Sequence, residues 1–162
     1  MTGPRALGLA VVVALVMAPA SAQPVPVLAV HELLDAHNAA RARVGSPPLV
    51  WSDELARDAE LWAAHLIVTH SFVQQPDAAH GENLFLIAVG TVSPAEVVRT
   101  WVAEMRDYDH ATNTCLGVCG HYTQVIWRTT RAVGCGMAFD GYRQVWVCEY
   151  EPPGNAAGTR PY

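Results

Sequence analysis

The chain has 162 residues, of which 51% are hydrophobic and 15% are charged, and its formal net charge is −5. This length is sufficient for one domain with a buried core. The acidic balance, together with the absence of lysine, disfavours nucleic acid and anionic membrane surfaces as partners. No G-x-S-x-G, P-loop or G-x-G-x-x-G motif occurs, so the common hydrolase and nucleotide-binding fingerprints are absent.

The N-terminus has the pattern of a secretory signal peptide. Arg5 precedes an apolar run at residues 6–17, and small residues follow at positions 20–22. We predict that residues 1–22 are removed and that the mature protein is secreted, to the extracellular space or to a periplasm. A permanent N-terminal anchor is the alternative, but the apolar run is too short for a stable membrane span.

Helical patterns dominate the next part of the chain. Residues 23–29 contain two prolines and predict an extended leader, and residues 30–162 predict a single domain. Apolar spacing predicts a first helix over residues 30–44, which ends at Gly45. Ser52 is a good N-cap for a second helix whose apolar stripe belongs to the core.

A loop and a third helix follow. Residues 71–83 are polar enough to predict a loop, and the short apolar run at residues 84–89 cannot be assigned from periodicity alone. Ser93, Pro94 and Glu96 combine an N-cap, a proline at the first helical position and a capping-box glutamate. They predict a third helix that extends to about residue 107.

The last third predicts a β-hairpin stapled by disulfides. Asp140-Gly141 separates two β-rich runs, and either a two-residue or a four-residue loop places Cys135 close enough to bridge Cys148. An even count of cysteines in an exported chain indicates disulfides, which leaves Cys115 for Cys119. A structural zinc site is the alternative, but paired C-x2-C spacings are missing. Early helices and a late hairpin predict an α+β layered domain.

One carboxylate lies in an unexpected place. Val97, Trp101, Glu104 and Tyr108 share one face of the predicted third helix, so Glu104 lies on an apolar stripe. A carboxylate there needs a partner or a raised pKa. The alternative is that it extends along the edge of the stripe to Arg99 or Arg106. The residue pattern alone is compatible with two histidines and one or two glutamates coming together, but it does not establish a site.

Four motifs in order resemble the CAP superfamily, which comprises cysteine-rich secretory proteins, antigen 5 and pathogenesis-related protein 1. The similarity is greatest to the plant pathogenesis-related protein 1 type and runs from about residue 33 to residue 162. It implies a three-layer α-β-α sandwich with a central antiparallel sheet, in which HYTQVIW forms a helical turn rather than a strand. The motifs are HGENLF, VVRTWVAEMRDYD, CGHYTQVIW and CEYEPPGN, at residues 80–85, 97–109, 119–127 and 148–155.

The resemblance also implies a cavity lined by two histidines and two glutamates. Matched motif by motif, these are His70, Glu82, Glu104 and His121, whereas His80 does not match and is interpreted as an ordinary surface or hydrogen-bonded core histidine. Some family members bind zinc at this set, so it is a candidate divalent-metal site. No cofactor is required; the alternative is a buried polar network that holds the layers together.

The expected function is a secreted binding or defence-type module for a small apolar ligand, a sterol or fatty acid, or for an extracellular protein partner. The expectation leans against an enzyme. One alternative is a zinc-dependent hydrolase with Glu82 or Glu104 as general base, and another is a structural scaffold.

Two departures from the plant pattern and one match to it matter. The chain has four cysteines where plant relatives commonly have six, so one bridge should be missing. Glu149 replaces the usual asparagine after Cys148, which we expect to change the surface chemistry beside the hairpin. The last eleven residues, 152–162, match a segment that plant relatives release as a signal, and here we expect a structural wrap over the sheet.

Overall fold

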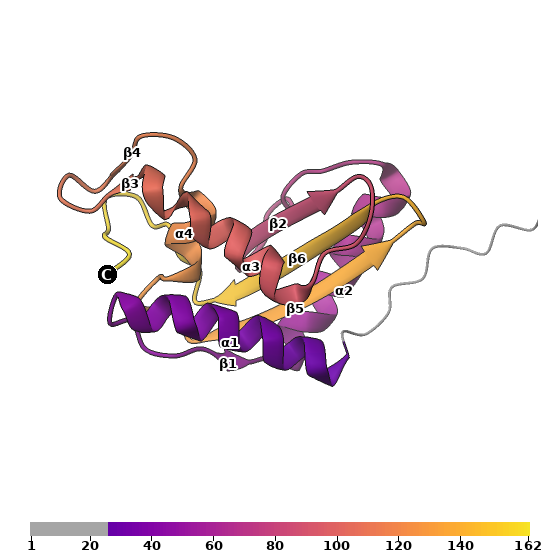
Figure 1. Ribbon diagram of the computed structural model, residues 1–162, viewed down its shortest axis with the longest axis horizontal. Coiled ribbons are helices and arrows are strands. Elements are labelled where there is room, and N and C mark those ends of the chain that lie inside the picture. Colours follow the sequence, from indigo (N-terminus) through magenta and orange to yellow (C-terminus); the bar gives the residue numbers. More distant parts are fainter. Residues whose placement is uncertain (1–25) are drawn as a thin grey trace, which may run out of the picture.

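A four-stranded sheet forms the middle layer of the computed structural model, which describes residues 26–162 (Figure 1). The strand order is β1-β5-β6-β2. The short β1 pairs in parallel with β5, and the other two pairings are antiparallel. The strands are β1 (Val50–Trp51), β5 (Ala132–Phe139), β6 (Gln144–Glu151) and β2 (Gly81–Ile87).

Helices cover both faces of this sheet. On one face lie α1 (Val27–Arg43), α3 (Pro94–Ala103) and α4 (Gly120–Val125), and on the other lies α2 (Asp53–Thr69) (Figure 1). The predicted α-β-α sandwich with a largely antiparallel sheet is therefore confirmed, as is the helical turn at HYTQVIW. No helix within residues 26–162 is long and apolar enough to span a membrane.

The first two helices begin where local chemistry allows. α1 begins at Val27, directly after Pro26, so the predicted extended leader at residues 23–29 is wrong for its last three residues. Proline fixes its own φ near the helical value and suits a helix start. The side chain of Ser52 caps α2 as predicted. The predicted signal peptide, residues 1–22, lies outside the described residues.

The third helix begins with the predicted capping box of Ser93 and Glu96 and changes character at its end. α3 ends at Ala103, and a 3₁₀ turn, η1 (Glu104–Asp107), completes the predicted length. A small second sheet follows, β3 (Tyr108–Asp109) paired with β4 (Thr114–Cys115). Glu104 therefore lies at the junction between α3 and η1.

The hairpin takes the four-residue loop of the two registers that the sequence allowed. Phe139 pairs with Gln144, and Cys135 lies directly opposite Cys148 and is bridged to it. The second disulfide joins Cys115 to Cys119, and all four cysteines are thereby oxidised. Both predicted pairings are confirmed, and the structural zinc alternative for the cysteines is not.

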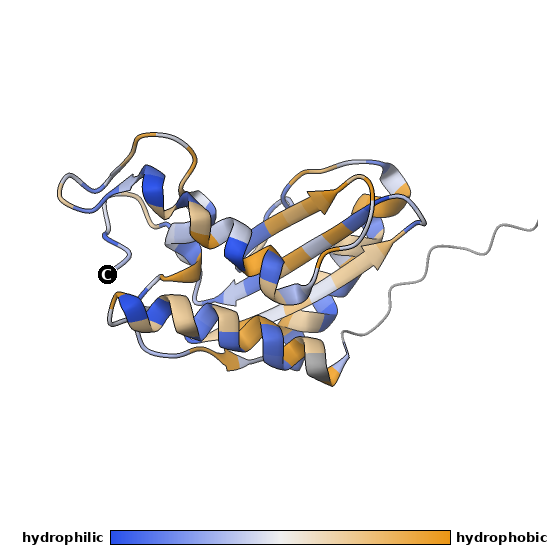
Figure 2. Cartoon of the chain, in the orientation of Figure 1, coloured by the Kyte–Doolittle hydropathy of each residue, from blue (hydrophilic) through white to orange (hydrophobic). Residues whose placement is uncertain are grey.

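The sheet separates two apolar cores. Toward α1, α3 and α4, the larger core contains Trp101, Val125 and Tyr150. Toward α2, the smaller core contains Leu84, Val147 and the alanines of α2. Hydrophobic residues occupy the second part of β2, residues 84–87, whereas hydrophobic and hydrophilic residues alternate along α1 and α3 (Figure 2). The two central strands, β5 and β6, are buried along most of their length on both faces, as sheets covered by two helical layers are.

Helix α2 lies unusually close to β5 because two glycines face it. A Cβ on Gly134 would collide with the backbone nitrogen of Ala56, and a Cβ on Gly136 would collide with that of Glu60. The contacted atoms belong to the helix backbone, which cannot rotate away as a side chain can. These glycines therefore set the distance between α2 and the sheet.

A buried hydrogen-bonded chain connects α1 to the sheet. His37 Nδ1 lies 2.8 Å from the carbonyl oxygen of Leu33, which can only accept, so this nitrogen donates. His37 Nε2 then accepts from the Tyr150 hydroxyl at 2.8 Å, and that hydroxyl accepts from Asn83 Nδ2 at 3.2 Å. Burial lowers the pKa of His37 to about 4, so the ring is neutral at physiological pH.

A buried guanidinium holds α4 against α1. Arg41 is 0% exposed, and burial lowers its pKa to about 10, so it is still charged at neutral pH. Its Nη1 donates to the carbonyls of Val125 and Trp127, both at 2.9 Å, just where α4 ends. Its other donations are to the carbonyls of Pro47 and Thr130. Four carbonyl dipoles thus replace a carboxylate partner and fix the position of α4.

The glycine contact predicts a stability effect. Gly136→Ala should lower the free energy of unfolding by about 2 kcal/mol, because a methyl group would push against the α2 backbone. Gly120→Ala is the matched control, since a Cβ there meets nothing within 4 Å, and its effect should stay within about 0.5 kcal/mol. Urea unfolding followed by circular dichroism measures both. Equal effects would contradict the close approach of α2.

The neutral histidine predicts a pH effect. As pH falls from 6.5 toward 4, His37 becomes protonated in the unfolded chain but stays neutral in the folded protein. The free energy of unfolding therefore decreases progressively, by about 3 kcal/mol in total. The stability difference between wild type and His37→Gln should therefore be largest above pH 6.5 and shrink as the pH approaches 4. Taking the difference removes other groups that titrate in this range. A difference that is constant from pH 4 to 7 would argue against it.

Candidate functional site

Glu104 and His121 form the central contact of the predicted four-residue set. Glu104 Oε1 lies 2.6 Å from His121 Nδ1. Glu104 Oε2 accepts from the backbone N–H of His121 at 3.0 Å and from that of Tyr122 at 3.3 Å. The carboxylate on the apolar stripe thus finds its partners on α4, and not on Arg99 or Arg106, which lie against Glu96 and Asp107.

This contact connects two helices. His121 and Tyr122 are in the first turn of α4, where backbone N–H groups have no partner within the helix, so Glu104 caps α4 from another segment. The His121 ring also stacks on Trp101 of α3 at a centroid distance of 6.3 Å. Asn83 of β2 donates to the His121 carbonyl at 3.1 Å. A carboxylate occupied in this way orients and caps a helix.

His70 lies in a different part of the fold. It follows the last residue of α2 and has a left-handed backbone with φ of 53°. Its Nδ1 lies 2.7 Å from Nη2 of Arg143, and because a guanidinium only donates, the histidine accepts. Arg143 also donates to Asp140 in the β5–β6 loop. His70 therefore ties the end of α2 to the tip of the hairpin.

Glu82 lies on the opposite face of the sheet from the Glu104–His121 pair. It is two residues from Leu84, which belongs to the core under α2, and alternate residues of a strand share a face. Its Oε1 accepts from the backbone N–H of Gln75 at 3.1 Å, whereas its buried Oε2 has no partner. Burial raises the pKa of Glu82 to about 7.

The four residues do not form a ready-made metal site. Among the described residues, no three of the four bring ligand atoms within 4.8 Å of one another, although all four lie in the described part of the chain. The Glu104–His121 pair offers two ligand types that zinc accepts, but His70 and Glu82 lie elsewhere. Zinc at the full set stays a prediction, and no chemical step is assigned to it.

A different group of side chains comes together on the α2 face. Asp58 of α2, His80 and Glu149 of β6 have ligand atoms within 4.8 Å of one another. The expectation that Glu149 alters the surface beside the hairpin is wrong, because its side chain is 2% exposed. Burial, with Asp58 and Glu82 nearby, raises the pKa of Glu149 to about 7. The interpretation of His80 as an ordinary surface or hydrogen-bonded core histidine is likewise incomplete, because its buried Nδ1 has no hydrogen-bond partner.

The sequence carried one usable signal for Glu149. It lies between Cys148 and Tyr150 in a strand with almost no other charge, and a strand buried on both faces loses the polar alternation of a half-exposed strand. A central position of β6 in the sheet predicts that the Glu149 side chain is buried. Asp58 and His80 have no comparable signal, because their proximity depends on how α2 and a loop pack.

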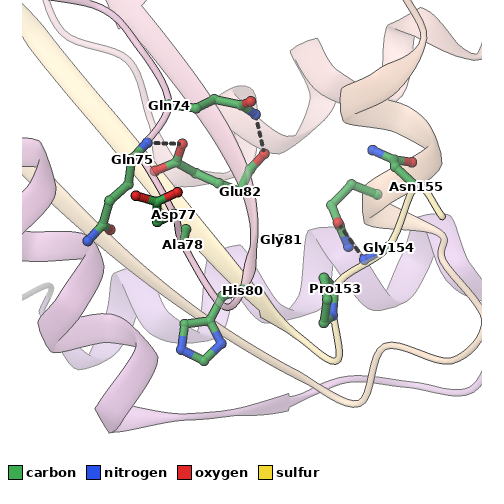
Figure 3. A pocket seen from close by; sticks show the side chains of 11 residues that line it. Gln74, Gln75, Asp77, Ala78, His80, Gly81, Glu82, Pro153, Gly154 and Asn155 are labelled. Atoms are coloured by element: carbon green, nitrogen blue, oxygen red, sulfur yellow. Dashed lines mark hydrogen bonds between the residues drawn. The ribbon is translucent and has the colours of Figure 1, made fainter. Parts of the chain in front are cut away.

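A polar pocket of about 430 Å³ opens beside this group. Figure 3 shows Gln74 and Gln75 in hydrogen bonds with Glu82, and the His80 ring turned away from the Glu82 carboxylate. On the pocket's other side, Gln124 accepts from the backbone N–H of Gly154 at 2.9 Å. The C-terminal segment thus forms one wall of the pocket, through residues 153–155, and its role as a wrap over the sheet stays a prediction.

The fold is that of a small α-β-α domain stapled by two disulfides. The family model described as "Cysteine-rich secretory protein family" (CAP) matches residues 34–150, and the chain belongs to this family. It is 43% identical over 137 residues to pathogenesis-related protein 1A of Nicotiana tabacum, covering 82% of this chain and 80% of the relative. It is 40% identical over 160 residues to a PR-1 type protein of Sambucus nigra, covering 96% and 93%.

Solved structures agree on the fold. Venom allergen-like protein 4 of Schistosoma mansoni matches with a TM-score of 0.66 and 26% identity, covering 82% of this chain and 92% of that one. NaASP2, solved with Zn²⁺, matches with a TM-score of 0.72 and 20% identity, covering 86% and 87%. Because the identity is only 20%, the second match supports the fold alone and gives no information about metal binding by this chain.

The capping contact predicts a measurable loss. Glu104→Gln should lower the free energy of unfolding by about 1–2 kcal/mol, because an amide keeps one of the two acceptor oxygens that α4 and His121 use. Glu151→Gln, at an exposed carboxylate, should change it by less than about 0.5 kcal/mol. A double-mutant cycle with His121→Ala should show coupling of at least about 0.5 kcal/mol. Additive effects would contradict the contact.

Proposed function

We propose that this CAP domain acts outside the cytoplasm as a binding protein for a small apolar ligand, specifically a fatty acid. The observation that carries the proposal is an apolar groove of about 440 Å³ between α1 and α3. That volume lies within the range of small-molecule pockets, which run from roughly 300 to 1,000 Å³. The proposal requires no cofactor. The predicted signal peptide and the secretory family support an extracytoplasmic setting.

The groove follows from residue size on α1. Ala36, Ala39 and Ala40 occupy positions i, i+3 and i+4, so they face α3 together and leave room where larger side chains would fill the space. Val98 and Val102 provide the apolar wall on α3. Burying an acyl chain there would remove apolar surface from water, at about 25 cal/mol per Å².

Two arginines favour a fatty acid over a neutral sterol. Arg43 on α1 and Arg99 on α3 both line the groove and are both exposed. A guanidinium can bind a carboxylate through two parallel hydrogen bonds. Arg99 also lies 3.9 Å from Glu96, but an exposed pair at that distance is weak and leaves the guanidinium available to a ligand.

A filled groove tests this proposal. Ala39→Phe places a ring in the groove at an exposed helical position, and it should weaken binding of a fluorescent fatty acid at least about tenfold, which corresponds to about 1.4 kcal/mol. Ala42→Phe, exposed on the same helix but outside the groove, is the matched control and should bind as wild type does. Competition with palmitate and with cholesterol separates the two ligand classes.

Three outcomes are distinct. Displacement by palmitate but not by cholesterol, with loss only in Ala39→Phe, supports the fatty acid. Displacement by cholesterol alone would move the proposal to a sterol. If the two phenylalanine variants bind the fatty acid equally well, or if the wild type does not bind it, the groove is not a ligand site. A protein partner would then remain as the target of the domain.

A further inference from the structure

The α2 face of the sheet carries a side-chain group that the CAP resemblance does not assign. Ligand atoms of Asp58, His80 and Glu149 lie within 4.8 Å of one another. They come from three separate parts of the chain: helix α2, the residue just before β2, and the central strand β6. Two carboxylates and an imidazole converging in this way match the donor set of a transition-metal site.

Buried atoms without partners set this group apart from an ordinary acidic surface. Glu149 is 2% exposed, and its Oε2 has no hydrogen-bond partner. His80 Nδ1 is also buried and unpartnered. Such groups in a folded protein are uncommon, because each costs about 1–3 kcal/mol and more when charged. A cation between them would satisfy both at once.

The local negative charge points the same way. Glu82 pairs directly with Glu149 across the strands and faces the same side, so a third carboxylate adjoins the group. None of the ion pairs formed within residues 26–162 involves Asp58, Glu82 or Glu149. Carboxylates this close repel one another when they are ionised, and a bound cation removes that repulsion.

Close packing of α2 makes the geometry possible. Gly134 is the register partner of Glu149 on the other side, and its missing side chain lets α2 approach the sheet. Asp58 therefore reaches a strand that a larger residue at position 134 would keep at a distance. The group is built into the contact between two layers of the fold.

We propose that Asp58, His80 and Glu149 bind one divalent first-row transition cation, with zinc as the representative ion. The imidazole separates this site from calcium and magnesium sites, which use oxygen ligands. Zinc accepts one imidazole and two carboxylates, and a water molecule completes its coordination. The cation stabilises the α2 layer against the sheet. The site lies across the sheet from Glu104 and His121 and shares no residue with the predicted family set, although Glu82 of that set adjoins it.

Zinc titration of the tag-free mature chain tests the proposal. Isothermal calorimetry should give one site per chain, and Co²⁺ in place of zinc should produce visible absorption bands. Glu149→Gln and His80→Gln should each weaken zinc binding at least about tenfold, since even outer-sphere partners of a metal are worth about 10–100-fold in affinity. Calcium at the same concentration should give no signal.

The controls separate the two candidate sites. His70→Gln and His121→Gln alter the predicted family set and should leave zinc affinity unchanged. If these variants abolish binding while His80→Gln and Glu149→Gln retain it, the metal belongs to the family cavity and the proposal is wrong. No zinc binding by wild type also overturns it.

A stability readout covers the case in which a buried variant folds poorly. Zinc should raise the melting temperature of wild type, and this rise should vanish in Asp58→Asn, whose side chain is exposed and whose substitution leaves the core intact. Without zinc, Glu149→Gln should melt at or above the wild-type temperature, because it removes a repelling charge. A zinc-induced rise that persists in Asp58→Asn contradicts the site.

Discussion

The close contact between α2 and the central strand β5 determines how the rest of this domain is organised. Gly134 and Gly136 present no side chain to the helix, so the helix backbone lies almost against the strand. The sheet is then covered tightly on this face, and on the other face the two helices α1 and α3 leave a groove between them. The two faces consequently differ in chemistry as well as in packing.

Successive side chains of a strand point to opposite faces of the sheet, so neighbouring polar residues of β2 and β6 lie in different environments. In β2, Asn83 points to the face where it contacts His121 and Tyr150, and its neighbour Glu82 points to the face of α2. In β6, Tyr150 joins the buried hydrogen-bonded chain and Glu149 points the other way. Adjacent residues thus contribute to unrelated sites on opposite sides of the sheet.

The Glu104–His121 contact shows how a polar pair can serve the fold. Its carboxylate caps α4, and Arg41 binds the carbonyls where α4 ends, so polar groups from outside satisfy both termini of this short helix. A helix of six residues has little stability of its own. Tertiary hydrogen bonds therefore determine whether it forms, and this explains a buried arginine and a carboxylate on an apolar stripe.

Local chemistry made part of this structure predictable. The capping box at Ser93, the cap at Ser52 and the bridge from Cys135 to Cys148 depend on near neighbours in the chain or on one hairpin. The hairpin register needed the structure, because Asp140-Gly141 is compatible with two loop lengths and the disulfide tolerates both. Contacts between segments that are distant in the chain could not be predicted either, because local sequence patterns are compatible with more than one packing.

Glu149 was misplaced because its burial depends on where its strand lies in the sheet. At an edge the same sequence would expose it; between β5 and β2, with α2 above, it is enclosed. Where the plant motif has an asparagine, an amide would satisfy this position without charge, so the carboxylate adds a cost that the fold alone does not offset. Either a proton or a cation must neutralise it. A proton on Glu149 neutralises that residue alone, whereas a cation would contact Asp58, His80 and Glu149 together, and this difference favours the proposed metal.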